Sequence, residues 1–141
     1  MSDAIVYVDT ADVREGALEE LKAGMKELVE LIDANEPRLL AYNVYFSDDG
    51  TRMTVVHVHL DSASLERHLE VAGPVFRRFV ELVTLSSIHI YGEPSAKVLE
   101  QVHEKARLLG RDVVVVDTLH AGFTRFGMGS RSAETAFHLR G

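Results

Sequence analysis

The sequence contains no cysteine and no tryptophan among its 141 residues. The lack of cysteine excludes disulfide bonds, thiolate metal ligands and cysteine nucleophiles, and it agrees with a reducing cytoplasm. No apolar run approaches the roughly 20 residues that span a bilayer. The first residues, Met1 to Asp3, lack the basic and then apolar layout of a secretory signal. We therefore expect a cytoplasmic protein with no membrane partner.

Positive charge is scarce as well. The chain has 15 Lys and Arg against 22 Asp and Glu, which gives a formal net charge of −7. Phosphate backbones bind cationic surfaces, and the short basic pairs at Arg77-Arg78 and at Arg125 and Arg131 form no stripe. We therefore expect no nucleic-acid partner. A hydrophobic content of 46% is enough for one domain with a core and argues against disorder.

The apolar pattern predicts two strand-helix-strand passes that are joined by a hairpin. The Asp49-Gly50 pair is a strong hairpin signal, and Gly73-Pro74 is expected to break the second helix. This order predicts an α+β domain of the ferredoxin-like βαββαβ type over residues 1–94, with the helices on one face of a four-stranded antiparallel sheet. The predicted strands are 5–8, 39–46, 52–60 and 86–91, and the predicted helices are 13–34 and about 62–83.

Residues 95–141 are expected to extend the same domain. Residues 95–109 have helical periodicity, and Gly110 is expected to end the helix. Val113–Val116 is a continuous apolar run, which is typical of a strand covered on both faces. We expect it to pair with a sheet edge, either its own or a partner's. Gly127–Ser132 has the composition of a flexible tail, and Ala136–Arg140 could dock on the domain.

Alternation along the predicted strands sorts their side chains into two faces. In the third strand Val56 and Val58 fall on one face, and His57 and His59 fall on the other. We expect the apolar face to meet the helices. The opposite face then collects rings, imidazoles and polar groups: Tyr7, Asp9, Asn43, Tyr45, His57, His59, His89 and Tyr91. Such a face suits a half-buried, wet interface, and it predicts a homodimer formed through the sheet.

The same face could instead hold a site. His57 and His59 project the same way and lie about 7 Å apart along the strand. With His89 from a nearby strand they could complete a three-histidine zinc or iron site that keeps an open position. Without a metal, Asn43, Tyr45 or a histidine could polarise a quinone or phenolate oxygen. The pattern leaves both possibilities open.

His68 lies on the predicted second helix, close to the Gly73-Pro74 break. One interpretation is a partly exposed helix histidine. The other is a proton donor or acceptor at the mouth of a cleft between helix and sheet, because an imidazole titrates near neutral pH. The sequence has no glycine-rich phosphate loop, no nucleophile elbow and no dinucleotide fingerprint.

Five segments of the sequence carry a family resemblance: 5–8 (IVYV), 14–18 (REGAL), 40–45 (LAYNVY), 68–69 (HL) and 88–95 (IHIYGEPS). They resemble the antibiotic-biosynthesis-monooxygenase family of dimeric α/β barrels. The resemblance implies a ferredoxin-like subunit whose sheet pairs with a second subunit into a closed barrel. Some members of this family oxidise phenols or quinols with molecular oxygen and need no metal or flavin. Others degrade haem with a strand-one asparagine, a tryptophan and a helix histidine. Of these three, only the helix histidine has a counterpart in this sequence, which is His68.

The leading hypothesis is therefore a cofactor-independent monooxygenase that acts on a small aromatic quinol or phenol. A deprotonated substrate of this kind activates oxygen itself, so the protein need only exclude water, orient the ring and stabilise the anion. The candidate polarising or proton-transfer residues are His68, Asn43, Tyr45 and His57. A non-catalytic dimeric binding or accessory protein is the first alternative, and a histidine-ligated metal protein is the second.

Overall fold

The computed structural model describes residues 4–125. The expected tail segments Gly127–Ser132 and Ala136–Arg140 lie outside the described residues. The elements follow one another as β1 (Ile5–Val13), α1 (Leu18–Asn35), β2 (Leu39–Phe46), β3 (Arg52–His59), α2 (Ser62–Phe76), the 3-10 turn η1 (Arg77–Phe79), β4 (Val83–Tyr91), α3 (Ala96–Leu109) and β5 (Val114–Asp117).

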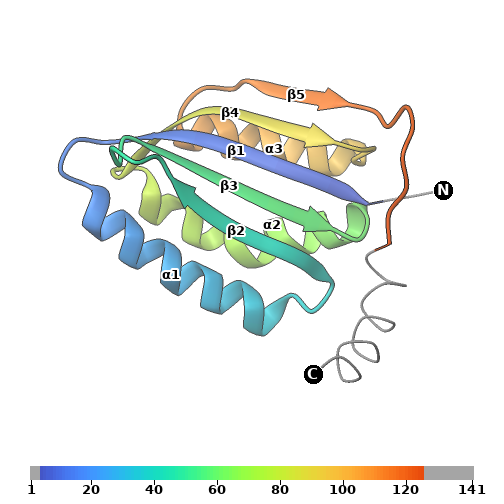
Figure 1. Cartoon of the computed structure of the whole chain (residues 1–141), viewed down its shortest axis with the longest axis horizontal. Coiled ribbons are helices and arrows are strands. Elements are labelled where there is room, and N and C mark those ends of the chain that lie inside the picture. The colour runs from blue at the N-terminus through green and yellow to red at the C-terminus, as the bar shows by residue number, and fades with distance from the viewer. Residues whose placement is uncertain (1–3, 126–141) are drawn as a thin grey trace.

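The strands form one sheet in the order β2-β3-β1-β4-β5. The pairs β2–β3, β3–β1 and β1–β4 are antiparallel, and β4–β5 is parallel. All three helices lie on one side of this sheet, and the other side carries no helix of the described chain (Figure 1). The predicted α+β, ferredoxin-like βαββαβ arrangement is confirmed.

The second helix does not break where the sequence predicted. Helix α2 runs through Pro74 and leads directly into η1. Pro74 lies near the C-terminal end of the helix, where the loss of one hydrogen bond has a small effect on the remaining turns. The helix begins at Ser62 and is capped by Asp61, whose carboxylate accepts a hydrogen bond from the Ser64 backbone N–H at 2.9 Å.

The strand predicted at Val113–Val116 is present as β5 and pairs with the edge of the chain's own sheet. The expectation of cover on both faces is wrong, because Val113, Val115 and Val116 are 38–43% exposed. The turn from α3 into β5 depends on Gly110. A Cβ atom there would lie 2.5 Å from the backbone N and O of Leu85, so only glycine permits this approach to β4.

The two faces of the sheet are the reverse of the expected assignment for β1 and β3. Tyr7 pairs with His57, and both face the helices with no exposed surface. Val8 pairs with Val56, and both are half-buried on the open face. The prediction failed because Ser64 and Lys105 from the helices pair with His59, Tyr7 and Asp9 inside the core, and a strand pattern alone cannot show those partners.

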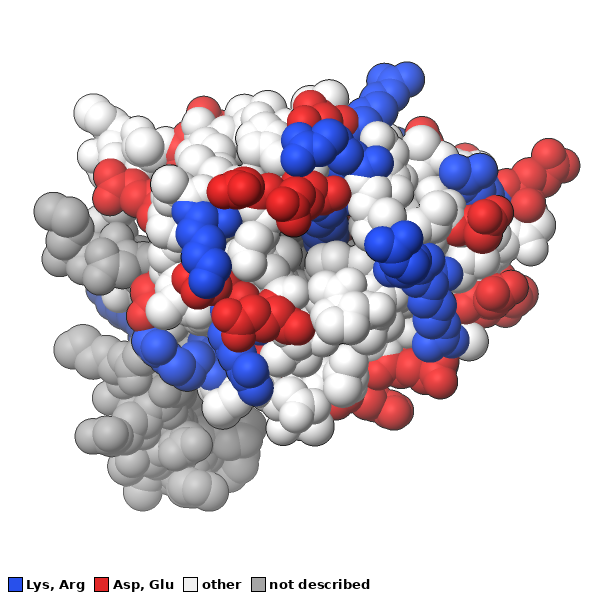
Figure 2. All heavy atoms as spheres, turned by 180° about the vertical axis from the view of Figure 1, so that it is seen from behind, with Lys and Arg blue, Asp and Glu red and all other residues white. Residues whose placement is uncertain are grey.

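On the side opposite to the view of Figure 1, acidic and basic side chains are interspersed, and this view shows no continuous basic area (Figure 2). None of the helices within residues 4–125 is long and apolar enough to cross a membrane.

Candidate functional site

A group of polar side chains is enclosed between the sheet and the helices. We refer to it as the buried polar cluster. It draws on β1, the C-terminal end of α1, β3, α2 and α3, and each member is at most 8% exposed. Its members are Tyr7, Asp9, Glu36, His57, His59, Ser64, His68 and Lys105. Buried polar and charged groups are costly unless they are paired, so their contacts decide what the cluster can do.

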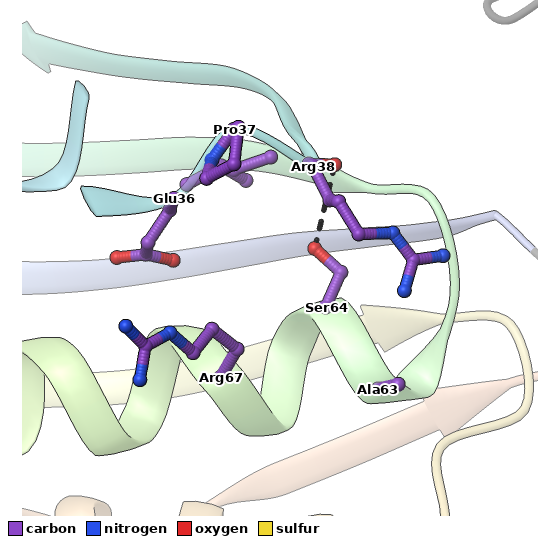
Figure 3. Close-up of a pocket in the computed structure, with 7 residues that line it drawn as sticks. Glu36, Pro37, Arg38, Ala63, Ser64 and Arg67 are labelled. Carbon is purple, nitrogen blue, oxygen red and sulfur yellow. Dashed lines mark hydrogen bonds between the residues drawn. The ribbon is translucent and has the colours of Figure 1, made fainter. Parts of the chain in front are cut away.

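A hollow of about 270 Å³ reaches this cluster from the surface. It lies between the turn from α1 to β2 and the start of α2 (Figure 3). Glu36 and Ser64 line the hollow and also belong to the buried polar cluster. A small molecule in the hollow would therefore contact two groups that are linked to the histidines. The hollow is lined by Glu36, Pro37, Arg38, Leu39, Ala63, Ser64 and Arg67.

His68 and Glu36 form a buried pair. Nδ1 of His68 lies 3.1 and 3.2 Å from the two carboxylate oxygens of Glu36, and both side chains are at most 2% exposed. Because a carboxylate accepts hydrogen bonds, Nδ1–H of the neutral ring donates, which leaves a lone pair on Nε2. Within residues 4–125 this Nε2 atom is buried and has no hydrogen-bond partner.

The position of Glu36 follows from the end of α1. Its backbone N–H donates to the Ile32 carbonyl at 2.9 Å, and Pro37 then prevents another helical turn. The chain turns toward β2 at this point. The Glu36 carboxylate is thus directed toward α2, as Figure 3 shows.

His57, His59 and Ser64 form a second hydrogen-bonded chain. Nδ1 of His57 lies 2.7 Å from Nε2 of His59, and Nδ1 of His59 lies 3.1 Å from the Ser64 hydroxyl oxygen. The Ser64 hydroxyl donates to the Arg38 carbonyl at 3.5 Å (Figure 3). Because the Ser64 proton is used in that bond, Nδ1–H of His59 donates to the Ser64 oxygen, and Nδ1–H of His57 donates to Nε2 of His59. Nε2 of His57 then carries a lone pair, and this buried atom also has no partner among the described residues.

Burial keeps these histidines in the neutral form. Desolvation lowers the pKa of His57 well below its ordinary value, with His68 and His59 acting in the same direction. Burial likewise lowers the pKa of His59 to about 3. For His68, burial outweighs the opposite effect of Glu36, and the pKa is lowered. His57 and His68 have ring centroids 4.7 Å apart, so two basic nitrogens lie in one water-poor region.

Tyrosine rings and a lysine complete the cluster. The Tyr7 ring is 4.1 Å from His57, and the Tyr42 ring is 4.9 Å from His57 and 5.5 Å from His68. Burial raises the pKa of Tyr7 to about 12 and also raises that of Tyr42, so both phenols keep their protons. Nζ of Lys105 lies 3.0 Å from the Tyr7 hydroxyl and 3.0 Å from a carboxylate oxygen of Asp9.

Of the four residues predicted as candidates, the structure brings two together. His57 and His68 meet in the buried polar cluster, and His68 has no exposed surface, so the interpretation as a partly exposed histidine is wrong. Asn43 and Tyr45 are exposed on the open face of the sheet, where they pair with Val56 and Thr54. The sheet separates them from His68.

The proposed three-histidine metal site does not form. His57 and His59 face the helices, whereas His89 pairs with Val8 on the open face. Within residues 4–125 no group of three or more histidine or carboxylate side chains is arranged to hold a metal ion.

Sequence reasoning missed Glu36, Ser64 and Lys105. A signal existed for the lysine, since Lys105 lies three residues after Val102 and four before Leu109, inside the apolar stripe of α3. For Glu36 and Ser64 the sequence carries no comparable signal, because each lies at a helix end where polar residues are ordinary.

No protein-family model matches the sequence, and no curated protein matches it. Solved structures do match the fold. MupZ from Pseudomonas fluorescens has a TM-score of 0.69 at 20% identity, over 89% of this chain and 91% of that protein. SnoaB, a cofactor-independent oxygenase from Streptomyces nogalater, has a TM-score of 0.56 at 17% identity, over 67% and 97% of the two chains.

A candidate antibiotic biosynthesis monooxygenase from Bacteroides thetaiotaomicron has a TM-score of 0.51 at 23% identity, over 60% of this chain and 84% of that one. These matches define the class: the chain is an α+β protein with a ferredoxin-like subunit fold. More particularly, it has the fold of the antibiotic-biosynthesis-monooxygenase-like proteins, as the sequence resemblance implies.

The buried histidines predict a loss of stability in mild acid. Their folded pKa values lie below the ordinary value of 6.5, so the unfolded chain binds protons first as the pH falls. The contribution of these histidines to stability is fully present well above pH 6.5 and decreases below it. For His59 the decrease continues down to its folded pKa of about 3. Between pH 7.5 and 5.5 we expect a loss of about 1.4 kcal/mol for each histidine that stays neutral. Urea unfolding at the two pH values checks this, and an unchanged midpoint would contradict it.

Proposed function

We propose that this chain is a cofactor-independent monooxygenase that binds a small aromatic phenol or quinol in the hollow and uses His68 as its general base. One observation carries the proposal. His68 is a buried, neutral imidazole that Glu36 orients through Nδ1, and its Nε2 lone pair has no partner within residues 4–125. The fold shared with SnoaB, which is described as a cofactor-independent oxygenase, supports the same class.

The pair has the protonation state and the charge partner that a general base needs. A base must be unprotonated at working pH and within reach of the proton it takes. His68 lies behind Glu36 and does not itself line the hollow, so the substrate has to extend past Glu36 and Ser64 to meet Nε2. Burial keeps His68 unprotonated, and the Glu36 carboxylate stabilises the imidazolium that forms after proton transfer, in the way that a carboxylate supports the histidine of a hydrolytic triad. Because the surroundings are poor in water, this electrostatic support is stronger than it would be in solution.

The reaction balances without a cofactor. The substrate gives a proton from an activated ring carbon to His68, and the resulting carbanion passes one electron to dioxygen. The two radicals combine into a peroxide anion, which takes the proton back from His68 and becomes a hydroperoxide. Loss of the remaining proton on that carbon, with cleavage of the O–O bond, then releases water and leaves a C=O group. Overall one CH₂ group and one O₂ become one C=O group and one H₂O. The protonated phenols of Tyr7 and Tyr42 are hydrogen-bond donors suited to the developing oxyanion.

Oxygen uptake tests the proposal. Purified protein is mixed with anthrone-type phenols, which carry the CH₂ group that this reaction oxidises, and oxygen consumption is followed with an electrode. Uptake above the rate of the uncatalysed reaction is the expected result. Tight binding of these compounds without uptake would favour the alternative of a non-catalytic binding protein.

We also propose that two copies associate through the open face of the sheet. Val6, Val8, Val56 and Val58 are half-buried there, and Tyr45 and Tyr91 are 54% and 45% exposed. An apolar sheet face that no helix covers is typical of a protein interface.

Sedimentation at micromolar concentration is expected to give a dimer for the native protein and a monomer for Val56→Asp, because the new carboxylate would be buried unpaired in the interface. Ala23→Asp on the exposed side of α1 adds the same charge and should leave the dimer intact. A native monomer, or a dimer that tolerates Val56→Asp, would contradict this arrangement.

A further inference from the structure

The proposed reaction uses His68, Glu36 and the phenols of Tyr7 and Tyr42, but it gives no reason for a lysine in the core. Lys105 and Asp9 are 8% and 6% exposed and lie 3.0 Å apart. A buried ion pair of this kind is often no more stabilising than a pair of apolar side chains of similar volume. Its presence beside the candidate site therefore points to a role other than stability.

Lys105 contacts two aromatic rings that pack against the histidines of the site. Its Nζ atom donates to the Tyr7 hydroxyl at 3.0 Å and lies 4.9 Å from the centre of the Tyr7 ring and 4.6 Å from that of Phe76. Tyr7 in turn packs on His57 at 4.1 Å, and Phe76 packs beside His68 at 6.4 Å. The ammonium group thus holds the two rings that border the two histidines.

We propose that Lys105 is a positioning residue of the candidate site, which holds Tyr7 against His57 and places a cation beside the two rings that border the imidazoles. The inference rests on the proposed function, because it assigns Lys105 to the same site. It also means that α3, from the part of the chain that follows the βαββαβ unit, completes the site from outside that unit.

The charges around His68 agree with this role. Burial is the largest cause of its lowered pKa, and the Lys105 cation acts in the same direction, whereas Glu36 and Asp9 act against both. Lys105 also lowers the pKa of His57 and His59. The titratable and charged groups that act on or pack against His68 are Asp9 from β1, Glu36 from the end of α1, Tyr42 from β2, His57 and His59 from β3, and Lys105 from α3. Tyr7 packs on His57 instead.

Nuclear magnetic resonance titration of the histidine rings tests the inference without any need for turnover. The His68 signal is identified by its loss in His68→Gln. In Lys105→Met the titration midpoint of His68 should rise, because the cation is removed while Asp9 remains. In the double variant Asp9→Asn, Lys105→Met both charges are removed, and the midpoint should lie between those of the native protein and Lys105→Met. The double variant also serves if Lys105→Met fails to fold.

Lys97→Met is the matched control, because Lys97 is an exposed lysine of the same helix that pairs with Glu66. It should leave the His68 midpoint unchanged. A His68 midpoint that stays at the native value in both Lys105 variants would overturn the inference. If the His68 midpoint rises as expected but neither the native protein nor any variant consumes oxygen, the proposed function fails. The role of Lys105 in positioning the rings beside the imidazoles then stands.

Discussion

Replacement of His68 by glutamine is expected to lower oxygen uptake by about a hundredfold or more. Glutamine can still donate to Glu36, but it offers no basic nitrogen for the substrate proton. Because His68 and Glu36 are both buried, some stability is lost as well, so folding of the variant is checked by circular dichroism. The rate is measured with an oxygen electrode under saturating substrate.

His103→Gln is the control for this variant, since His103 is 42% exposed and pairs with Asp112 at the surface. It should keep the native rate. A second variant, Glu36→Gln, keeps an acceptor for Nδ1–H and removes the charge that stabilises the imidazolium, so its rate should also fall. Native rates in folded His68→Gln and Glu36→Gln would show that His68 is not the base.

Replacement of Lys105 by methionine is expected to lower the free energy of unfolding by about 3–5 kcal/mol, because it leaves the Asp9 carboxylate buried without its partner. The double variant Asp9→Asn, Lys105→Met has no unpaired charge and should recover most of that loss. Urea unfolding at pH 7.5 measures both variants and the native protein.

The surface variant Lys97→Met provides the comparison. Its ion pair with Glu66 is exposed, and such pairs contribute at most about 1 kcal/mol. If Lys105→Met is no less stable than Lys97→Met, then Asp9 finds another partner or becomes protonated. The buried pair would then contribute no more to the free energy of unfolding than an exposed pair does.

The sequence was sufficient to predict the arrangement of the elements because those signals are local. Hairpin residues at Asp49-Gly50, the alternation in β2 and β3 and the periodicity of α1 each depend on neighbours along the chain. The strand at Val114–Asp117 was also predictable from its β-branched run. The passage of α2 through Pro74 was not, since packing against the sheet decides whether a helix continues.

The faces of the sheet were less predictable for a physical reason. A rule that places valine inside and histidine outside is correct when the histidine has no buried partner. Here Ser64 lies beside His59, and Lys105 lies beside Tyr7 and Asp9. Lys105 lies 96 residues after Asp9. Ser64 is only five residues from His59 but lies on the following helix, so the interior position of His59 depends on how that helix packs on the sheet.

The candidate site was predictable only in part. His57 and His68 were chosen for their chemistry, and the fold places their rings 4.7 Å apart. Asn43 and Tyr45 were chosen for the same reason, but their strand turns them to the open face. Residue type indicates which groups can transfer protons, while the register of β2 and β3 decides which of them can act on one substrate.

The most direct test of the account is a crystal structure with a phenolic substrate analogue bound. The central claim is that the substrate meets His68 between the helices and the sheet. We expect the analogue to occupy the hollow lined by Glu36 and Ser64, with a donor atom about 2.6–3.2 Å from Nε2 of His68. An analogue bound instead on the open face, against Asn43 and Tyr45, with the hollow empty, would contradict the account.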